Sequence, residues 1–508
     1  GTNRDPISKP ITDVNKALVT AGKNIRRANI LVSAIDSDLI PEDKRETVET
    51  FKEKIPEFEK YTQEGIRYSK LLLSAMGDKT TKSYLILFAN NTELRPAGGF
   101  PGSYALITFD KGYLKKVFVD DIYNIDGQVK NNIIPPKPLQ HITANWGMRD
   151  ASWFADYPTS ARKVEEFYQN DGGAAVDGVI TLTPTVIERI LEVVGPISMP
   201  EYGLILDSKN FVAEIQEEVE YRADRAQPKR ILADFEPKLF AALSKQPKDK
   251  MFKIFDSLLD SVSEKQILAY FNDPDLQKLV EDNNFSGTLK KTAADYLMVA
   301  FSNVRGFKSD AVTSNSYWLE TNLNDNQIEH TLTVSRTHNG GNSKYKFYNK
   351  EDASYVRIYA PRSAVLVAID GQTKTNFAPL INHRDLGYKT DSDLAQVENS
   401  TYHPLPYVDV FEESDKKVFG FWMVTKPRQT QAVVLRYYVP ELENKTNKYK
   451  LEWQKQPGTI TDGLRFSFRP AQNQPANFHT QSSSTLASKV PTKKSPVSLA
   501  NSFTTSWS

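Results

Sequence analysis

The chain has 508 residues, of which 39% are hydrophobic and 25% are charged, and its formal net charge is +1. This length predicts about two to four structural units. The lack of a basic excess excludes a protein that binds nucleic acid by neutralising phosphates. The absence of cysteine excludes thiol nucleophiles, cysteine zinc sites and disulfides.

Two features of the sequence bear on its location. A lack of cysteine is typical of bacterial proteins outside the cytoplasm, where free thiols oxidise. No segment approaches the ~20 apolar residues that span a bilayer, and the sequence opens with "GTNRDP", without an initiator methionine. We therefore expect an extracytoplasmic, cell-surface protein, anchored to the membrane through an N-terminal helix that precedes this sequence.

Residues 1–80 predict a helical hairpin, because apolar residues recur at helical spacing in two seams. The seams are Val14, Leu18, Ala21, Ile25, Ala28, Val32 and Ile35, then Val48, Phe51, Ile55, Phe58, Ile66 and Leu73. "DSDLIPEDK" separates them, and its Pro41 suits a first helical turn. Two interpretations stay open, a stalk that lifts the rest off a membrane and a coiled coil that binds a protein partner.

Residues 82–312 predict an α/β domain, because short apolar runs of strand type alternate with helical patterns. The strand-like runs are "SYLILFAN" (83–90), "SYALITF" (103–109) and "VDGVITL" (176–182). The helical patterns include "SARKVEEFYQN" (160–170) and "TPTVIERILEVVG" (183–195), and they continue to about residue 298.

Residues 313–471 predict an all-β immunoglobulin-like sandwich. Strand patterns such as "IEHTLTVSRTH", "VFGFWMVTK" and "QAVVLRYYVP" follow one another with turn-rich spacers between them. Residues 472–508 are rich in Ser, Thr, Asn and Gln and poor in apolar residues. We expect this low-complexity tail to be disordered, since it cannot bury enough surface to offset chain entropy.

The stretch "NTELRPAGGFPGSY" (91–104) is the most unusual in the chain, because it places Arg95 and three glycines between two predicted strands. It is no P-loop, since a strand and not a helix follows it. No G-x-S-x-G pentapeptide or H-E-x-x-H motif occurs anywhere, which argues against the common hydrolases. Either Arg95 binds an anion with help from loop N–H groups, or it is a structural residue that holds loop carbonyls.

The sequence closely resembles a known bacterial family. The motifs are "NNTELRPAGGFPGSYALITFDKGYL", "DGVITLTPTVIERILEVVGPI" and "SNVRGFKSD", which are similar to the family catalogued as domain of unknown function 4012 (DUF4012) over about residues 82–312. This resemblance implies a membrane-anchored surface protein with a large extracytoplasmic part. The family name carries no activity.

A weaker resemblance, at the level of the fold, is to the LytR–CpsA–Psr phosphotransferases. These enzymes move glycopolymers from polyprenyl-pyrophosphate carriers onto peptidoglycan. Arg95, "MRDAS" (148–152) and "EYRADRAQPKRILADF" stand where that family has its motifs. Two positions depart from the pattern, since Ala97 replaces an acidic residue and "VFVDDIYN" lacks an arginine.

The second resemblance implies a site for a polyprenyl-phosphate-linked glycan, because arginines bind phosphate bidentately. The implied catalytic candidates are Arg95, Asp121 and Asp150, and Mg²⁺ is implied at Asp120, Asp121 and Asp150. The implied substrate-binding residues are Arg95, Gly98, Gly99, Gly102, Ser103, Arg149, Arg222, Arg225, Arg230, Asn303 and Lys308.

Simpler interpretations of these residues stay open. The three arginines of "EYRADRAQPKR" lie among acidic residues and could form solvated pairs along a helix. Asp120 and Asp121 could be solvated turn carboxylates. Asn303 and Lys308 could belong to a hinge between domains.

Two functions follow as alternatives. The first is a membrane-tethered cell-envelope protein that binds a phosphorylated, lipid-linked glycan, with transfer of that glycan left open. The second is a non-catalytic surface scaffold or adhesion module, in which the hairpin or the sandwich binds protein partners. Arginines gathered with carboxylates around an apolar tunnel would favour the first, and arginines spread over exposed helices would favour the second.

Overall fold

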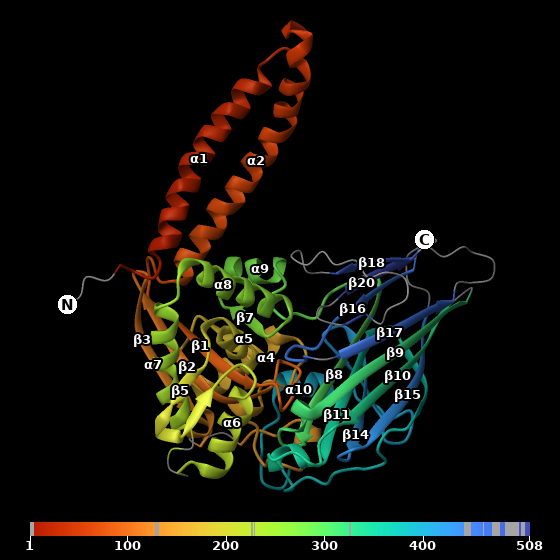
Figure 1. Cartoon of the computed structure of the whole chain (residues 1–508). Coiled ribbons are helices and arrows are strands. Elements are labelled where there is room, and N and C mark those ends of the chain that lie inside the picture. Colours follow the sequence, from red (N-terminus) through yellow and green to blue (C-terminus); the bar gives the residue numbers. More distant parts are fainter. Residues whose placement is uncertain are drawn as a thin grey trace.

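The computed structural model describes residues 5–127, 132–224, 227, 229–324, 327–440, 449–460, 462–469, 478–482, 497–498 and 503–507. Within these residues the chain forms an N-terminal helical hairpin, an α/β unit and two large sheets (Figure 1). The predicted mixed α/β fold with a preceding helical hairpin is confirmed.

The hairpin consists of α1 Lys9–Ser33 and α2 Glu42–Ala75, and it projects away from the rest of the molecule (Figure 1). The two helices approach closely at glycines. A Cβ on Gly22 would lie 3.3 Å from Ile66, and one on Gly65 would lie 3.1 Å from Leu18. Pro41 is the N-cap residue of α2, next to the first-turn position that the sequence predicts.

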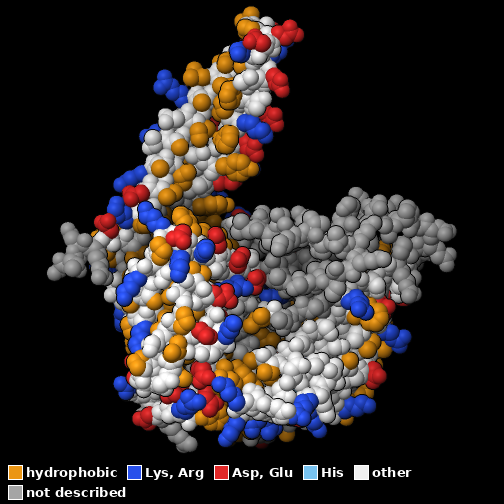
Figure 2. Space-filling model, in the orientation of Figure 1, with side chains coloured by type: hydrophobic (Ala, Val, Ile, Leu, Met, Phe, Trp, Pro, Cys, Tyr) orange, Lys and Arg blue, Asp and Glu red, His pale blue; other side chains and the backbone are white. Residues whose placement is uncertain are grey.

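Large apolar side chains also lie on the outside of the hairpin, and Figure 2 shows hydrophobic side chains along its length. Those that are more than half exposed include Ile30 (64%), Leu31 (60%), Phe51 (52%) and Phe58 (59%). None of the helices in the described part of the chain is long and apolar enough to cross a membrane.

The α/β unit is built on a five-stranded sheet of the order β3-β2-β1-β4-β7. β1 and β4 are parallel, and the other neighbours are antiparallel. A tight turn joins β2 to β3, with φ of 53° at Lys111 and 74° at Gly112, in the sequence "DKG" (110–112), which is typical of such turns. The strands are β1 Lys82–Asn90, β2 Phe100–Asp110, β3 Tyr113–Asp121, β4 Gly178–Leu182 and β7 Ile267–Phe271.

Helices surround this sheet and form two apolar cores with it. Val164 and Phe167 of α4 pack with Leu85 and Leu87 of β1 in one core, whereas α5 to α8 enclose another. The helices are α3 Ile122–Asp126, α4 Tyr157–Asn170, α5 Pro184–Val194, α6 Phe211–Glu217, α7 Arg230–Ser244, α8 Lys248–Ser263 and α9 Pro274–Asp282, and a small ribbon pairs β5 Ile197–Met199 with β6 Leu204–Leu206.

The C-terminal part holds two sheets that share one core, which includes Phe301, Leu332, Val356 and Val433. The first sheet has the order β13-β14-β11-β8-β16-β20-β18 and the second β12-β15-β10-β9-β17-β19. The first contains β8 Asp295–Arg305, β11 Asp352–Pro361, β13 Asp409–Glu413, β14 Lys416–Thr425, β16 Lys450–Trp453, β18 Phe478–Ser482 and β20 Phe503–Trp507. The second contains β9 Thr313–Asn324, β10 Gln327–His338, β12 Val365–Asp370, β15 Thr430–Pro440, β17 Asp462–Arg469 and β19 Val497–Ser498, and α10 Ser392–Asn399 lies between β12 and β13.

This arrangement does not confirm the immunoglobulin-like sandwich predicted from the sequence. β16 runs parallel to β8, and β17 runs parallel to β9, so the sheets are mixed. β8 also precedes residue 312, the predicted border, yet it pairs with β11 of the C-terminal sheet. Its residues from Asp295 to Val304 are all buried, and such a continuous buried run does not reveal which sheet a strand will join.

Backbone strands β18, β19 and β20 fall within the segment 472–508 that was predicted to be disordered. β18 and β20 pair with each other, and β20 pairs with β16. The other residues of this predicted tail lie outside the described part of the chain.

Buried polar contacts join the α/β unit to the first C-terminal sheet. Arg357 of β11 donates to the carbonyl of Trp153 (2.6 Å) and pairs with Glu413 of β13 (3.2 Å). Glu413 in turn accepts from the backbone N–H of Ala155 (2.8 Å). These groups are almost fully buried, so the two parts depend on each other to satisfy them.

Candidate functional site

Arg95 lies in the connection between β1 and β2, and it is only 2% exposed. Its Nη1 donates to the carbonyls of Leu94 (3.2 Å) and Asn303. Its Nη2 lies 3.7 Å from Glu93 Oε1 and 3.8 Å from Asp150 Oδ1. Its buried Nε has no hydrogen-bond partner among the described residues. Backbone carbonyls and carboxylates of the same chain are thus the partners of the Arg95 guanidinium.

A segment from the C-terminal part covers the glycine loop. Gly98 and Gly99 have φ of 113° and 158°, which favour glycine. A Cβ on Gly458 would lie 1.9 Å from the Gly98 oxygen, and Gln456 Nε2 donates to the Arg95 carbonyl (3.2 Å). The close backbone approach that the glycines permit is therefore used by residues 456–458 of the same chain.

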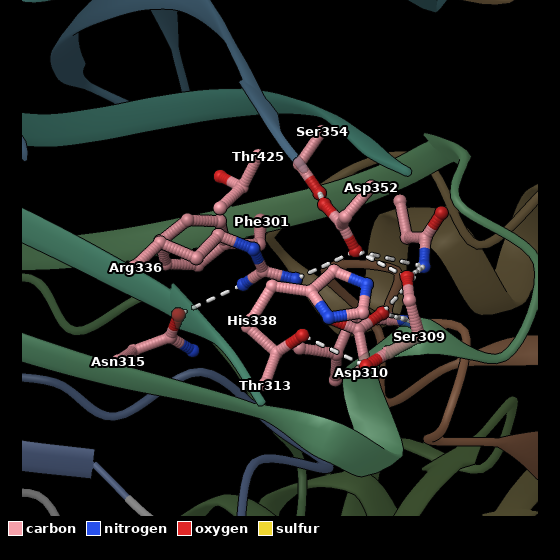
Figure 3. Close-up of polar contacts among 12 residues, drawn as sticks. Phe301, Ser309, Asp310, Thr313, Asn315, Arg336, His338, Asp352, Ser354 and Thr425 are labelled. Carbon is pink, nitrogen blue, oxygen red and sulfur yellow. Dashed lines mark hydrogen bonds and ion pairs between the residues drawn. The ribbon is translucent and has the colours of Figure 1, made fainter. Parts of the chain in front are cut away.

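A buried ion-pair network (Figure 3) also contacts this loop. Arg336 is 0% exposed, and it donates to Asp310, to Asp352 (3.0 Å) and to Asn315 (2.8 Å). Asp310 Oδ2 also accepts from the backbone N–H of Leu94 (2.8 Å). Burial alone would raise the pKa of Asp352, but the guanidinium of Arg336 and hydrogen bonds from Ser309 and Ser354 together outweigh it and lower that pKa. Burial raises the pKa of Asp310.

Beside this anchored loop, charged side chains from several distant segments gather around one tyrosine ring. We call them the charged cluster, which consists of Arg95, Arg149, Lys229 and Lys308, of Glu93, Asp121, Asp126, Asp150 and Glu220, and of Tyr123. They come from the β1–β2 connection, the end of β3, α3, the turn Met148–Asp150, the turn Glu218–Arg222, the residue before α7 and the turn after β8.

The lysines of the cluster each contact carboxylates. Lys229 Nζ lies 3.0 Å from Asp121 Oδ2 and also donates to the Gly102 carbonyl. Lys308 Nζ lies 2.9 Å from Glu93 Oε2 and 3.4 Å from Glu220 Oε1. Their side chains are 21% and 17% exposed, so both reach solvent at the rim of the cluster.

Arg149 is the third cation at this rim, with a side chain that is 28% exposed. Its Nη1 lies 3.4 Å from Asp126 Oδ2, and its Nε lies 3.5 Å from Asp150 Oδ2. Its guanidinium carbon lies 5.4 Å from the centre of the Tyr123 ring, and Lys229 Nζ lies 5.9 Å from the same centre. Two cations therefore lie over one ring that is 52% exposed, at distances typical of cation–π contact.

Burial changes the pKa values of the two lysines to different degrees. It lowers the pKa of Lys229, and the attraction of Asp121 only partly offsets this. It would also lower the pKa of Lys308, but the carboxylates of Glu93 and Glu220 outweigh it and raise that pKa. Lys229 is thus a cation whose charge the surroundings compensate incompletely.

The pKa values of the two buried acids of the cluster shift in the same direction. Burial raises the pKa of Asp126 and of Asp150, and nearby arginines partly offset the effect. Asp126 also accepts from the backbone N–H groups of Met148 (2.7 Å) and Arg149 (3.2 Å). These carboxylates fix the turn that carries Arg149.

Two of the predicted arginines lie away from the cluster. Arg222 is 48% exposed and lies 3.9 Å from Glu214, and Arg230 is 69% exposed and lies 3.5 Å from Asp234. Arg230 thus forms the solvated helix-face pair that the sequence left open, at the spacing i,i+4, whereas Arg222 forms an exposed pair with an acid eight residues earlier. Arg225 lies outside the described residues.

The other predicted residues have partners within the protein. Ser103 is 5% exposed and pairs with Asp121 in the sheet. Asn303 is 1% exposed, and its Nδ2 donates to Asp310 Oδ2 (2.8 Å). The Gly102 carbonyl accepts from Lys229.

The carboxylates named for Mg²⁺ have other partners. Asp120 accepts from Asn124 (2.6 Å), Asp121 caps α3 and pairs with Lys229, and Asp150 faces the two arginines of the cluster. In the described part of the chain, no three histidine or acidic side chains gather as a metal site requires. These residues do not fit a Mg²⁺ site as arranged, and we derive no chemistry through a metal.

Five members of the cluster were not singled out in the sequence. Glu93 stands two residues before Arg95, Glu220 stands two residues before Arg222, and Lys229 directly precedes Arg230. Tyr123 and Asp126 follow Asp121 in the same short helix. Their closeness in sequence to the candidate residues was the one signal that could have indicated them.

A known family matches the part of the chain that contains some of the residues of this site. Residues 79–220 match the family described as "Protein of unknown function (DUF4012)". This part of the chain is a DUF4012 region. The membership predicted from the sequence is thus confirmed over these residues. No curated protein matches the chain.

Several solved structures are similar to part of the chain. Lin1025 from Listeria innocua is 11% identical, with 43% of this chain and 86% of that chain covered and a TM-score of 0.21. TagV from B. subtilis is 14% identical, with 43% and 87% covered and a TM-score of 0.23. An M1 zinc metallopeptidase from Deinococcus radiodurans is 10% identical, with 38% and 42% covered and a TM-score of 0.19. At TM-scores this low, the similarities support no argument about the chemistry of this chain.

The DUF4012 region does not contain the whole charged cluster. Arg95, Asp121 and Arg149 lie within residues 79–220, whereas Lys229 and Lys308 lie beyond them. The segment that covers the glycine loop, residues 456–458, also comes from outside. The site is therefore completed by parts of the chain that follow the DUF4012 region.

Proposed function

We propose that the chain is a cell-envelope protein that binds the phosphate of a polyprenyl-linked glycan at the charged cluster. The observation that carries the proposal is the half-exposed ring of Tyr123 with Arg149 and Lys229 over it. A phosphate at this rim would accept from both cations, and the ring would offer an apolar face to the group attached to the phosphate. An extracytoplasmic location and an N-terminal membrane anchor are parts of the same proposal.

The electrostatics favour an anion next to Lys229 in particular. Its pKa is lowered by burial because Asp121 compensates its charge only in part. A phosphate oxygen would supply the missing negative charge and stabilise the ammonium form. Arg149 offers a planar fork that suits two phosphate oxygens.

We propose binding and not transfer for this arrangement. Phosphoryl transfer depends on neutralising the charge of the transferring group. Arg95, the residue expected to lead that chemistry, is buried and occupied by loop carbonyls.

A non-catalytic scaffold or adhesion module is the second candidate. It is favoured by the apolar side chains that α1 and α2 expose along the hairpin, among them Leu31 and Phe58 (Figure 2). The exposed ion pairs of Arg222 and Arg230 agree with it as well. In this case the hairpin would bind a protein partner, and the charged cluster would only stabilise the fold.

Isothermal titration with farnesyl pyrophosphate, a soluble prenyl pyrophosphate, separates the two candidates. We expect the wild-type protein to bind it and Lys229→Gln to bind about ten- to hundredfold more weakly, the usual effect of losing a charge-assisted hydrogen bond. Arg222→Gln is the matched control, because its side chain is 48% exposed and lies outside the cluster. Equal affinity in the wild type and Lys229→Gln, or no binding at all, would contradict the phosphate site and favour the scaffold function. Repeating the titration with Mg²⁺ tests the predicted metal.

A further inference from the structure

A cleft of about 530 Å³ opens in the C-terminal part of the molecule, apart from the residues of the charged cluster. Its walls come from β11, from β14, from the connection after β12 and from the residues that lead into β13. The volume falls within the range of about 300 to 1,000 Å³ typical of small-ligand sites. The lining residues used below are Tyr355, Asn376, His403, Tyr407, Asp409 and Trp422.

One wall of the cleft is aromatic and held in place by further rings. Trp422 contacts Tyr355 with ring centres 5.4 Å apart and Phe377 with centres 4.6 Å apart. Phe377 is itself stacked on His141 at 4.3 Å. A half-buried indole fixed in this way offers a flat apolar surface whose ordering costs little entropy on binding.

The polar groups of the cleft are also fixed before any ligand arrives. Asp409 Oδ2 accepts from the hydroxyl of Tyr355 (2.6 Å), and its Oδ1 lies 3.0 Å from His403 Nδ1. The side chain of His403 is 64% exposed, which leaves its Nε2 able to reach a ligand. Asn376 adds an amide with both donor and acceptor atoms.

The charge of the cleft points to a neutral ligand. Among the described lining residues there is no lysine or arginine, and Asp409 is the acidic one. A phosphate would find no cationic partner comparable to those of the charged cluster. The combination that remains is a flat aromatic face with fixed hydroxyl, amide, imidazole and carboxylate groups, which matches a sugar ring with its C–H face and its hydroxyls.

The rim of the cleft carries a local backbone distortion. Tyr407 has φ of 60°, which is uncommon for an aromatic residue. Its side chain is 40% exposed and lines the cleft. Strained residues of this kind concentrate at ligand clamps, and here the strain places a second ring at the opening.

We infer that this cleft binds a neutral saccharide, with Trp422 and Tyr407 against the sugar rings and with Asp409, His403 and Asn376 bound to hydroxyl groups. This site does not depend on the charged cluster, so either site can exist without the other. An aromatic-lined groove can also take a proline-rich peptide. The fixed carboxylate and imidazole favour the saccharide, since a peptide of this type offers few donors for them.

Saturation-transfer difference NMR on the full chain tests the inference with three neutral tetrasaccharides, namely those of N-acetylglucosamine, cellulose and starch, and with a proline-rich decapeptide. We expect transfer to at least one saccharide and a loss of affinity of about fivefold or more in Tyr407→Ala. Asp409→Asn keeps the shape of the side chain and should weaken binding to a similar degree. Tyr402→Ala is the matched control, because this tyrosine is 49% exposed, close in sequence and absent from the lining.

The outcomes separate clearly. Saccharide binding that Tyr407→Ala and Asp409→Asn weaken and Tyr402→Ala leaves unchanged supports the inference. No saccharide binding at ten millimolar, equal binding by all variants, or transfer to the peptide alone would overturn it. Circular dichroism of each variant shows whether the fold is intact, and failure of this site would leave farnesyl pyrophosphate binding at the charged cluster unaffected.

Discussion

Replacing Arg336 with methionine should destabilise the protein strongly, because it leaves two buried carboxylates without a cation. Arg336 is 0% exposed, and the side chains of Asp310 and Asp352 are 3% and 0% exposed. Removing one partner of such a buried group typically costs about 3 to 5 kcal/mol. Asp310 also accepts from the Leu94 N–H, so the loop that carries Arg95 should loosen at the same time. Urea denaturation followed by tryptophan fluorescence measures the loss in the free energy of unfolding.

An exposed arginine serves as a control for this prediction, and a variant that also removes the two carboxylates tests its cause. Arg362 is 66% exposed and pairs with Glu412 at 2.9 Å, so Arg362→Met should cost less than about 1 kcal/mol. Combining Arg336→Met with Asp310→Asn and Asp352→Asn removes the uncompensated charges and should recover part of the loss. A cost below about 1 kcal/mol for Arg336→Met alone would refute the view that this network holds the loop.

Two further predictions concern single residues. Burial raises the pKa of Glu165 to about 7, so its contribution to stability is complete below about pH 4.5 and is lost as the pH rises through 7. Thermal melts of Glu165→Gln should match the wild type at pH 4 and show a relative gain of about 1 to 3 kcal/mol at pH 8, whereas a constant difference between the two pH values would contradict the assignment. Gly458→Ala should lower the melting temperature by several degrees, because its Cβ would meet the Gly98 oxygen at 1.9 Å with φ of 82°. An unchanged melting temperature would mean that the covering segment does not press on the glycine loop.

Local patterns in the sequence were sufficient for the hairpin and for the first strands of the α/β unit. The seams of α1 and α2 have helical spacing, and the turn at Lys111 and Gly112 has a short-range signal. No such local signal predicted that β8 would join the first C-terminal sheet, or that β16 and β17 would pair in parallel with β8 and β9. β16 pairs with β8 across a separation of about 150 residues, and the choice of partner is made by tertiary packing.

The candidate site was predictable only in part, for the same reason. Arg95 stood out because an arginine between two apolar strands needs partners, and the structure supplies them from Leu94 and Asn303. Lys229 was overlooked beside Arg230, although Lys229 enters the charged cluster and Arg230 stays in solvent. Which of two neighbouring cations faces inward depends on how the start of α7 packs, and spacing alone does not encode this.

Hydrogen–deuterium exchange with farnesyl pyrophosphate tests most directly the central claim, that the charged cluster is a phosphate-binding site. The account predicts slower exchange in the backbone around Gly102, in the segment 121–127 and in the turn Met148–Asp150, where the ligand would order the elements that carry the rim. The protection should disappear in Lys229→Gln. Protection confined to other parts of the chain, or none under conditions in which titration detects binding, would contradict the account.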